Sequence, residues 1–228
     1  MKTDWRLELA MLLVIAAMFA AAAAVWSVAP SEIPVHWNVS GEVDRYGGKF
    51  EGLLLLPLIA LGLYLLLRYL PRIDPLRANY ARFSGVYTAI RVALLLLMAA
   101  IYGVVIAWVL QNPIDMSRLM PAAIGALFVV LGSVLAKVKP NWFVGIRTPW
   151  TLSSKRSWER THRLGGWLFL ALGGLFLLTG ILGLGSFGLA AFGVMVGVFV
   201  ILVVYSYFAW RGDPEKQTPG ASRRGDDV

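Results

Sequence analysis

The chain has no cysteine, so disulfide bonds, thiolate metal sites and cysteine nucleophiles are excluded. It has only two histidines, His36 and His162, and only 15% of its 228 residues are charged. A soluble domain has about 25% charged residues, whereas 58% of this chain is hydrophobic. The shortage of charge therefore predicts an integral membrane protein with no soluble domain.

Six apolar runs approach or exceed the roughly 20 residues that a helix needs to cross a membrane. They cover residues 7–29, 52–69, 86–110, 119–136, 164–184 and 189–210. The first run is longer than the apolar part of a signal peptide, which has about 7–15 residues, so we expect it to stay as the first span. The sequence thus predicts an all-α six-helix membrane domain over residues 1–210. A disordered polar tail is predicted over residues 211–228.

Lysine and arginine are distributed very unequally between the two sides that six spans define. Three of the 21 lie on the side opposite the termini, Arg45, Lys49 and Arg118, and Arg91 lies inside the third span. The remainder lie on the side that carries both termini. Because Lys and Arg gather in cytoplasmic segments, both termini are predicted to be cytoplasmic. The net charge of +8 then reflects topology, and nucleic acid is not expected as a partner.

The cytoplasmic loop over residues 137–166 is basic and rich in tryptophan, as is typical of the membrane–water interface. Pro149 disfavours helical geometry at Thr148, so we expect irregular backbone over residues 145–151 and a helix from about residue 155. On that helix Trp158 and His162 share one face. Glu159 and Arg163 are expected to pair on another.

Two interpretations of this loop remain open. Arg147, Trp150, Trp158 and His162 line a cytoplasmic pocket or docking surface, or the loop is an anchor that caps the bundle. A di-metal carboxylate site is excluded, because it needs two Glu-x-x-His motifs with two further glutamates. Neither a metal nor a cofactor is expected.

The extracytoplasmic loop over residues 30–52 has β-like composition at residues 33–37, followed by Gly-containing turns at Gly41 and Gly47. Such a fold would bring together polar groups that fit a ligand or, more weakly, a metal. These groups are His36, Asn38, Asp44 and Lys49. The simpler interpretation is a small cap whose polar groups satisfy one another.

Together, both loops resemble the signature of the SdpI family, bacterial multi-span membrane proteins named for an immunity protein against a secreted antimicrobial peptide. In the cytoplasmic loop the resemblance rests on Asn141, residues 145–152, Trp158, Thr161, His162 and Gly165. In the other loop it rests on residues 33–37, Gly41, Asp44 and Lys49.

The resemblance implies a bacterial plasma-membrane protein, not an enzyme, that protects against a toxin peptide and is coupled to a cytosolic repressor. The implied binding residues are His36, Asn38, Asp44 and Lys49 outside, and Asn141, Arg147, Thr148, Trp150, Thr151, Trp158 and His162 inside.

Alternatives to an immunity role stay open. A transporter or flippase for a lipid or other amphiphile would explain Arg91 within a span, although snorkelling explains it equally well. An intramembrane enzyme using Glu159 and His162 lacks a nucleophile or a metal set. Gly193 and Gly197 have the spacing of helix contacts, which fits ordinary bundle packing or an oligomer interface.

Overall fold

The computed structural model describes residues 4–184 and 188–217. In these ranges six helices are long and apolar enough to cross a membrane, which confirms the predicted fold class. They are α1 (Trp5–Val25), α2 (Leu55–Ile73), α3 (Ser84–Val109), α4 (Met116–Leu135), α6 (Lys155–Leu182) and α7 (Gly188–Arg211). Shorter elements connect them: strands β1 (Ile33–Trp37) and β2 (Val43–Gly47), the π-helix η1 (Phe50–Leu54), the 3₁₀ helix η2 (Arg77–Phe83) and α5 (Pro149–Leu152).

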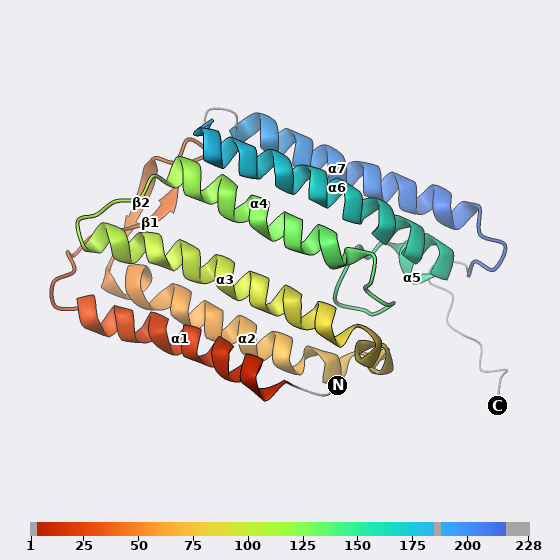
Figure 1. The fold of residues 1–228 in the computed structure, drawn as a ribbon, viewed down its shortest axis with the longest axis horizontal. Coiled ribbons are helices and arrows are strands. Elements are labelled where there is room, and N and C mark those ends of the chain that lie inside the picture. Colours follow the sequence, from red (N-terminus) through yellow and green to blue (C-terminus); the bar gives the residue numbers. More distant parts are fainter. Residues whose placement is uncertain (1–3, 185–187, 218–228) are drawn as a thin grey trace.

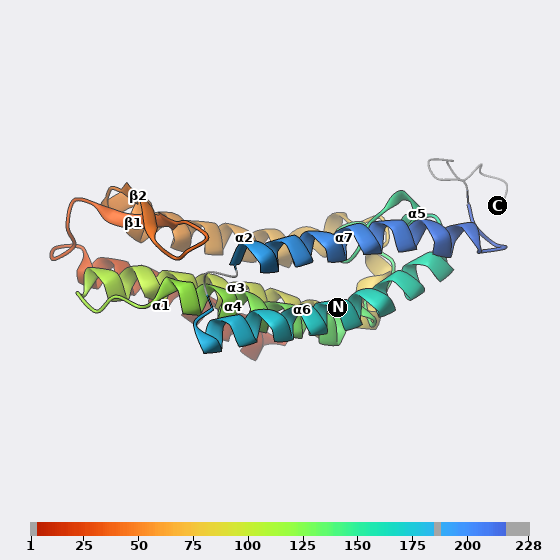
Figure 2. The same cartoon turned by 90° about the horizontal axis from the view of Figure 1, so that it is seen from above.

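The long helices form two layers. Helices α1, α3, α4 and α6 lie side by side, and α2 and α7 pack on one face of this layer near its opposite edges (Figure 1, Figure 2). The β1–β2 hairpin lies at one end of that face, here named the outer end. The start of α1, α5 and the end of α7 lie at the opposite, inner end (Figure 1).

Helices α4 and α6 pack most closely, because glycines of each face the backbone of the other. A Cβ atom built at Gly173 would lie 2.8 Å from the carbonyl oxygen of Gly125, and one at Gly132 would lie 2.8 Å from that of Gly166. Gly180 meets the first turns of α4 in the same way. Small residues allow this approach in lipid, where helices are held together by packing.

Three other glycines of α6 and α7 behave differently. Nothing in the described part of the chain lies within 4 Å of a Cβ built at Gly174, Gly193 or Gly197. The expectation that Gly193 and Gly197 serve ordinary packing within the bundle is therefore wrong, because they face away from the other helices.

Arg91 of α3 lies inside the bundle, only 3% exposed. Its Nη1 donates to Oε1 of Glu8 in α1 at 2.6 Å, and its Nη2 donates to Oε2 at 3.0 Å. The hydroxyl of Tyr64 in α2 also donates to Glu8, at 2.7 Å. Snorkelling is thus the wrong explanation for Arg91, because its charge is neutralised by a partner within the membrane domain.

Two local expectations near the inner end need correction. Residues 145–148 are irregular as predicted, but Pro149 starts the short helix α5, because proline is favoured in the first turn of a helix. No ion pair joins Glu159 and Arg163 among the described residues, although both are exposed on one side of α6.

The predicted disordered tail also differs, over residues 212–217. Ser154, which caps the start of α6, donates a hydrogen bond to Asp213 at 2.5 Å, and the backbone N–H of Gln217 donates to the carbonyl of Ser153 at 3.0 Å. The hydrogen bond from Ser154 lowers the pKa of the Asp213 carboxyl. Residues 218–228 of the predicted tail lie outside the described residues.

Candidate functional site

The outer loop forms a two-stranded antiparallel hairpin whose polar side chains pair with one another. Nδ1 of His36 lies 2.5 Å from Oδ1 of Asp44, and the amide of Asn38 donates to Glu42 at 3.1 Å. These contacts agree with a self-satisfied cap. Within residues 4–184 and 188–217, no three His, Asp or Glu side chains are grouped as a metal site requires.

The hairpin is held at both its base and its tip. At the base, Lys49 donates to the carbonyl of Trp26 at 2.8 Å, and Ile33 is fully buried. Lys49 is thus separate from the other predicted outer residues and fastens the loop to the end of α1. At the tip, Gly41 has φ +82° and a Cβ there would lie 2.5 Å from the backbone nitrogen of Ser117 in α4. Only glycine fits this contact.

Beneath the hairpin lies a cavity of about 390 Å³, here named the outer groove. Its walls come from β1 and from helices α3, α4, α6 and α7, and most of them are apolar. His36, Asn38 and Ser117 supply polar groups. The apolar lining includes Trp37, Ile101, Met116, Met120, Ile124, Phe176, Phe192 and Met195.

Trp37 separates the outer groove from a second hollow of about 210 Å³ on the α2 side. Leu55, Ile59 and Val105 contribute to this second hollow. The hairpin therefore covers apolar space on both sides of one tryptophan. Sequence reasoning missed the helical residues of both hollows, because apolar side chains within apolar spans carry no signal of which ones line a cavity.

At the inner end, His162 links the loop to α6. The backbone N–H of Ile146 can only donate, so Nε2 of His162, 3.0 Å away, accepts. Nδ1 then carries the proton and donates to the carbonyl of Trp158 at 2.8 Å. The His162 ring stacks on Trp158 with centroids 4.1 Å apart. His162 is thus a neutral structural link in this arrangement.

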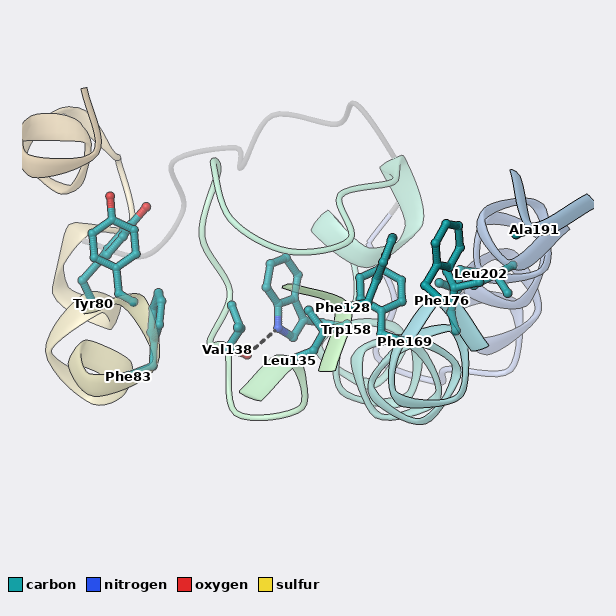
Figure 3. Packing of buried hydrophobic residues seen from close by; sticks show 13 residues of the cluster. Tyr80, Phe83, Phe128, Leu135, Val138, Trp158, Phe169, Phe176, Ala191 and Leu202 are labelled. Atoms are coloured by element: carbon teal, nitrogen blue, oxygen red, sulfur yellow. Dashed lines mark hydrogen bonds between the residues drawn. The ribbon is translucent and has the colours of Figure 1, made fainter. Parts of the chain in front are cut away.

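Trp158 makes a further connection across the inner loop. Its Nε1 donates to the carbonyl of Val138, just after α4, at 2.9 Å (Figure 3). The indole lies in a buried cluster with Tyr80 and Phe83 on one side and Phe169 on the other (Figure 3). Trp158 therefore joins the end of α4 to the start of α6.

Other predicted inner residues also fold the loop. Asn141 is fully buried, and its Oδ1 accepts from the backbone N–H of Val144 at 2.6 Å. Thr148 and Thr151 form a capping box at the start of α5, and the Thr148 hydroxyl lies 2.9 Å from that of Ser206 in α7. Asn141 and Thr151 thus fold the loop on itself, and Thr148 holds it against α7.

Only two of the seven predicted inner residues reach the surface. Arg147 is exposed and donates to the carbonyl of Trp142 at 2.8 Å, and Trp150 is half-buried against Tyr207. A pocket lined by Arg147 and Trp150 together with Trp158 and His162 is therefore absent from this part of the described structure, because the latter two are 1% and 0% exposed.

Sequence reasoning also missed Asp74, which connects the segment between α2 and η2 to the inner loop. Its Oδ2 accepts from the hydroxyl of Tyr80 at 2.9 Å and from the backbone N–H of Trp142 at 3.0 Å. Asp74 is only 2% exposed. An aspartate directly before a proline indicates a turn. Nothing in the sequence shows which distant residues Asp74 would bind.

Two family models match the chain. Residues 137–206 match the SdpI/YfhL protein family, and residues 13–61 match a domain of unknown function (DUF1648). The first match covers the inner loop, α6 and most of α7, and the second covers most of α1, the hairpin and the start of α2. No curated protein and no solved structure is significantly similar to the chain. The match over the inner loop and the six apolar helices confirm the resemblance, and this chain is a multi-pass membrane protein whose residues 137–206 match the SdpI/YfhL protein family.

Proposed function

We propose that this protein gives immunity to an amphipathic antimicrobial peptide by binding it in the outer groove. The observation that carries the proposal is a preformed apolar cavity of about 390 Å³ under a hairpin fixed at both ends. Preformed apolar cavities with a few polar groups are the usual form of ligand sites. The proposal places the outer end outside the cell, as the distribution of Lys and Arg predicts.

The groove lining suits the apolar face of a peptide helix. Met116, Met120 and Met195 are unbranched and flexible, so they adapt to irregular apolar surfaces. An amphipathic helix binds by placing apolar side chains in such a groove. Phe192 adds a large aromatic surface at the α7 side.

Exposed acidic side chains near the groove would attract a cationic peptide, and Arg118 balances one of them, since its Nε lies 3.4 Å from Asp115. Asp44 and Glu42 are exposed on the hairpin, and Asp115 is exposed at the start of α4. A hydrogen bond from the Ser117 hydroxyl lowers the pKa of Asp115, so its carboxylate is ionised at neutral pH. Opposite charges at the rim raise the rate of encounter and select the ligand.

Coupling to a cytosolic repressor would use the exposed part of the inner loop. Trp142 is 54% exposed and Arg147 lies beside it, so these two present an aromatic and a cationic group to a partner. Trp158 and His162 would act only indirectly, by fixing the loop beneath that surface.

The transporter or flippase alternative loses its main support. It rested on Arg91 as a charge within a span and on Arg147 near the interface; the Arg91 guanidinium is bound by Glu8, whereas Arg147 is exposed. A lipid chain would still fit the outer groove, so the experiment must distinguish a peptide from a lipid.

The test is survival of cells that express the protein, compared with an empty vector, on a panel of membrane-active peptides. Met195→Trp fills the groove, whereas Val196→Trp adds the same bulk on the lipid-exposed side of α7. We expect protection against a cationic peptide to be lost in Met195→Trp and kept in Val196→Trp. Absence of protection against every peptide, with equal membrane levels, would refute the immunity role and direct the search to lipids in a deletion strain.

A further inference from the structure

A further hollow, of about 630 Å³, lies at the inner end of the bundle between the end of α2 and η2. Its charged lining consists of Arg68, Arg72 and Arg77, and no acidic side chain contributes to it. We name it the arginine hollow. Three guanidinium groups facing one space form an environment that suits a ligand with negatively charged oxygens.

The charges of this hollow are poorly compensated by the described residues. Nε of Arg68 lies 3.5 Å from Glu8, but the Glu8 carboxylate already accepts two hydrogen bonds from Arg91. No described carboxylate forms an ion pair with Arg72 or Arg77, and both are exposed. An excess of positive charge therefore remains at the surface.

The nearest acid in the sequence, Asp74, is turned away from the solvent. It is 2% exposed and is occupied by the Tyr80 hydroxyl and the Trp142 backbone. The fold thus uses this carboxylate to connect two loops and leaves the arginines without it.

The neighbours of the hollow are those of a membrane interface. Ile73 is 68% exposed and Tyr69 is 49% exposed, both at the end of a membrane span. The guanidinium carbon of Arg72 lies 4.9 Å from the centre of the Tyr69 ring, which orients the side chain. Aromatic rings at this position lie at headgroup level.

We propose that the arginine hollow binds the phosphate of an anionic phospholipid. The planar guanidinium groups of Arg72 and Arg77 donate paired hydrogen bonds to phosphate oxygens. The acyl chains lie along Tyr69 and Ile73 at the edge of the bundle. This site is independent of the peptide site, since it lies at the opposite end of the molecule.

A second basic hollow at the start of α6 provides a matched control. Three acids, Glu159, Asp213 and Glu215, largely balance its positive charge, which comes from Lys155, Arg156, Arg160 and Arg163. A double variant of Lys155 and Arg160 removes two positive charges at the same end of the bundle, as many as the double variant of Arg72 and Arg77 does. Non-specific attraction to anionic lipid would fall equally in the two double variants.

The experiment measures retention of phosphatidylglycerol by the purified full-length protein in detergent, using native mass spectrometry. We expect Arg72→Gln/Arg77→Gln to weaken binding by about tenfold or more, since charge-assisted hydrogen bonds are lost. Lys155→Gln/Arg160→Gln should weaken it by less than about threefold, and phosphatidylcholine should bind poorly to the wild type.

Three results would overturn the proposal. An equal loss in the two double variants would show only general electrostatic attraction. Equal retention of phosphatidylcholine would show that the anionic headgroup is not recognised. Binding of inorganic phosphate that phosphatidylglycerol does not displace would assign the hollow to a soluble anion instead.

Discussion

Removing the charge of Glu8 should destabilise the protein more than removing its partner. In Glu8→Gln, Arg91 keeps a neutral acceptor but loses the only carboxylate that contacts it among the described residues. The Arg91 side chain is 2% exposed, so water does not replace that charge. Leaving one member of a buried ion pair without its partner costs about 3–5 kcal/mol.

Replacing Arg91 instead leaves the Glu8 carboxylate, which has other partners that compensate its charge. In Arg91→Met, Glu8 keeps the hydrogen bond from Tyr64 and the nearby charge of Arg68, and its side chain is 13% exposed. We therefore expect a loss of only about 1–2 kcal/mol. The double variant Glu8→Gln/Arg91→Met should be more stable than Glu8→Gln alone, because no buried charge then lacks a partner.

The assay is the free energy of unfolding in mixed detergent micelles, followed by tryptophan fluorescence for the wild type and the three variants. Arg163→Gln is the control, because it removes an exposed arginine that forms no ion pair with a carboxylate in the described structure. If Glu8→Gln were as stable as the wild type, or if the two single losses simply added in the double variant, the ion pair would not have the role assigned to it.

Gly173→Leu should lower the free energy of unfolding by about 3 kcal/mol because the added side chain forces α4 away, whereas Gly174→Leu, which points into open space, should change it little. Equal stability of the two variants in the same detergent titration would contradict the α4–α6 contact. Gly145→Ala should cost about 2 kcal/mol and alter tryptophan fluorescence, since φ is +109° there and a Cβ would collide with Nε2 of His162. Because the pKa of Asp213 is lowered, its stabilising effect is complete above about pH 4 and is lost as pH falls through the lower folded value. Thermal unfolding of Asp213→Asn should therefore depend less on acid pH than that of the wild type, and an unchanged dependence would argue against the contact.

The spans and the hairpin could be predicted from the sequence because their signals are local. Apolar runs are long enough to cross a bilayer, and Gly41 follows a β-like segment. The shared face of Trp158 and His162 also followed from helical spacing. Whether this face points into the bundle or away from it could not be predicted, because both the lipid and the interior of the bundle are apolar.

Partners that are distant in the chain were beyond sequence reasoning. Glu8 and Arg91 are separated by 83 positions, so the sequence could not distinguish a pair from snorkelling. The outer groove was missed for a similar reason. Met120 and Met195 lie on different helices and meet only because α4 and α7 both pack against α6.

The glycine contacts between α4 and α6 are compatible with more than one alignment of the two helices along each other. Gly166, Gly173 and Gly180 recur every seven residues, as do Gly125 and Gly132. Sliding one helix by two turns, about 10.5 Å, would again place glycine opposite glycine, so the glycine pattern alone does not select one alignment.

The choice between these alignments comes from contacts other than the glycine pairs, such as those of Phe128 in α4 with Phe169 and Phe176 in α6. The hydrogen bond from Trp158 to the carbonyl of Val138 ties the start of α6 to the end of α4, and it would break on such a slide. The inner loop thus helps to fix how far α4 and α6 can slide along each other, a task that the glycine spacing alone leaves undone.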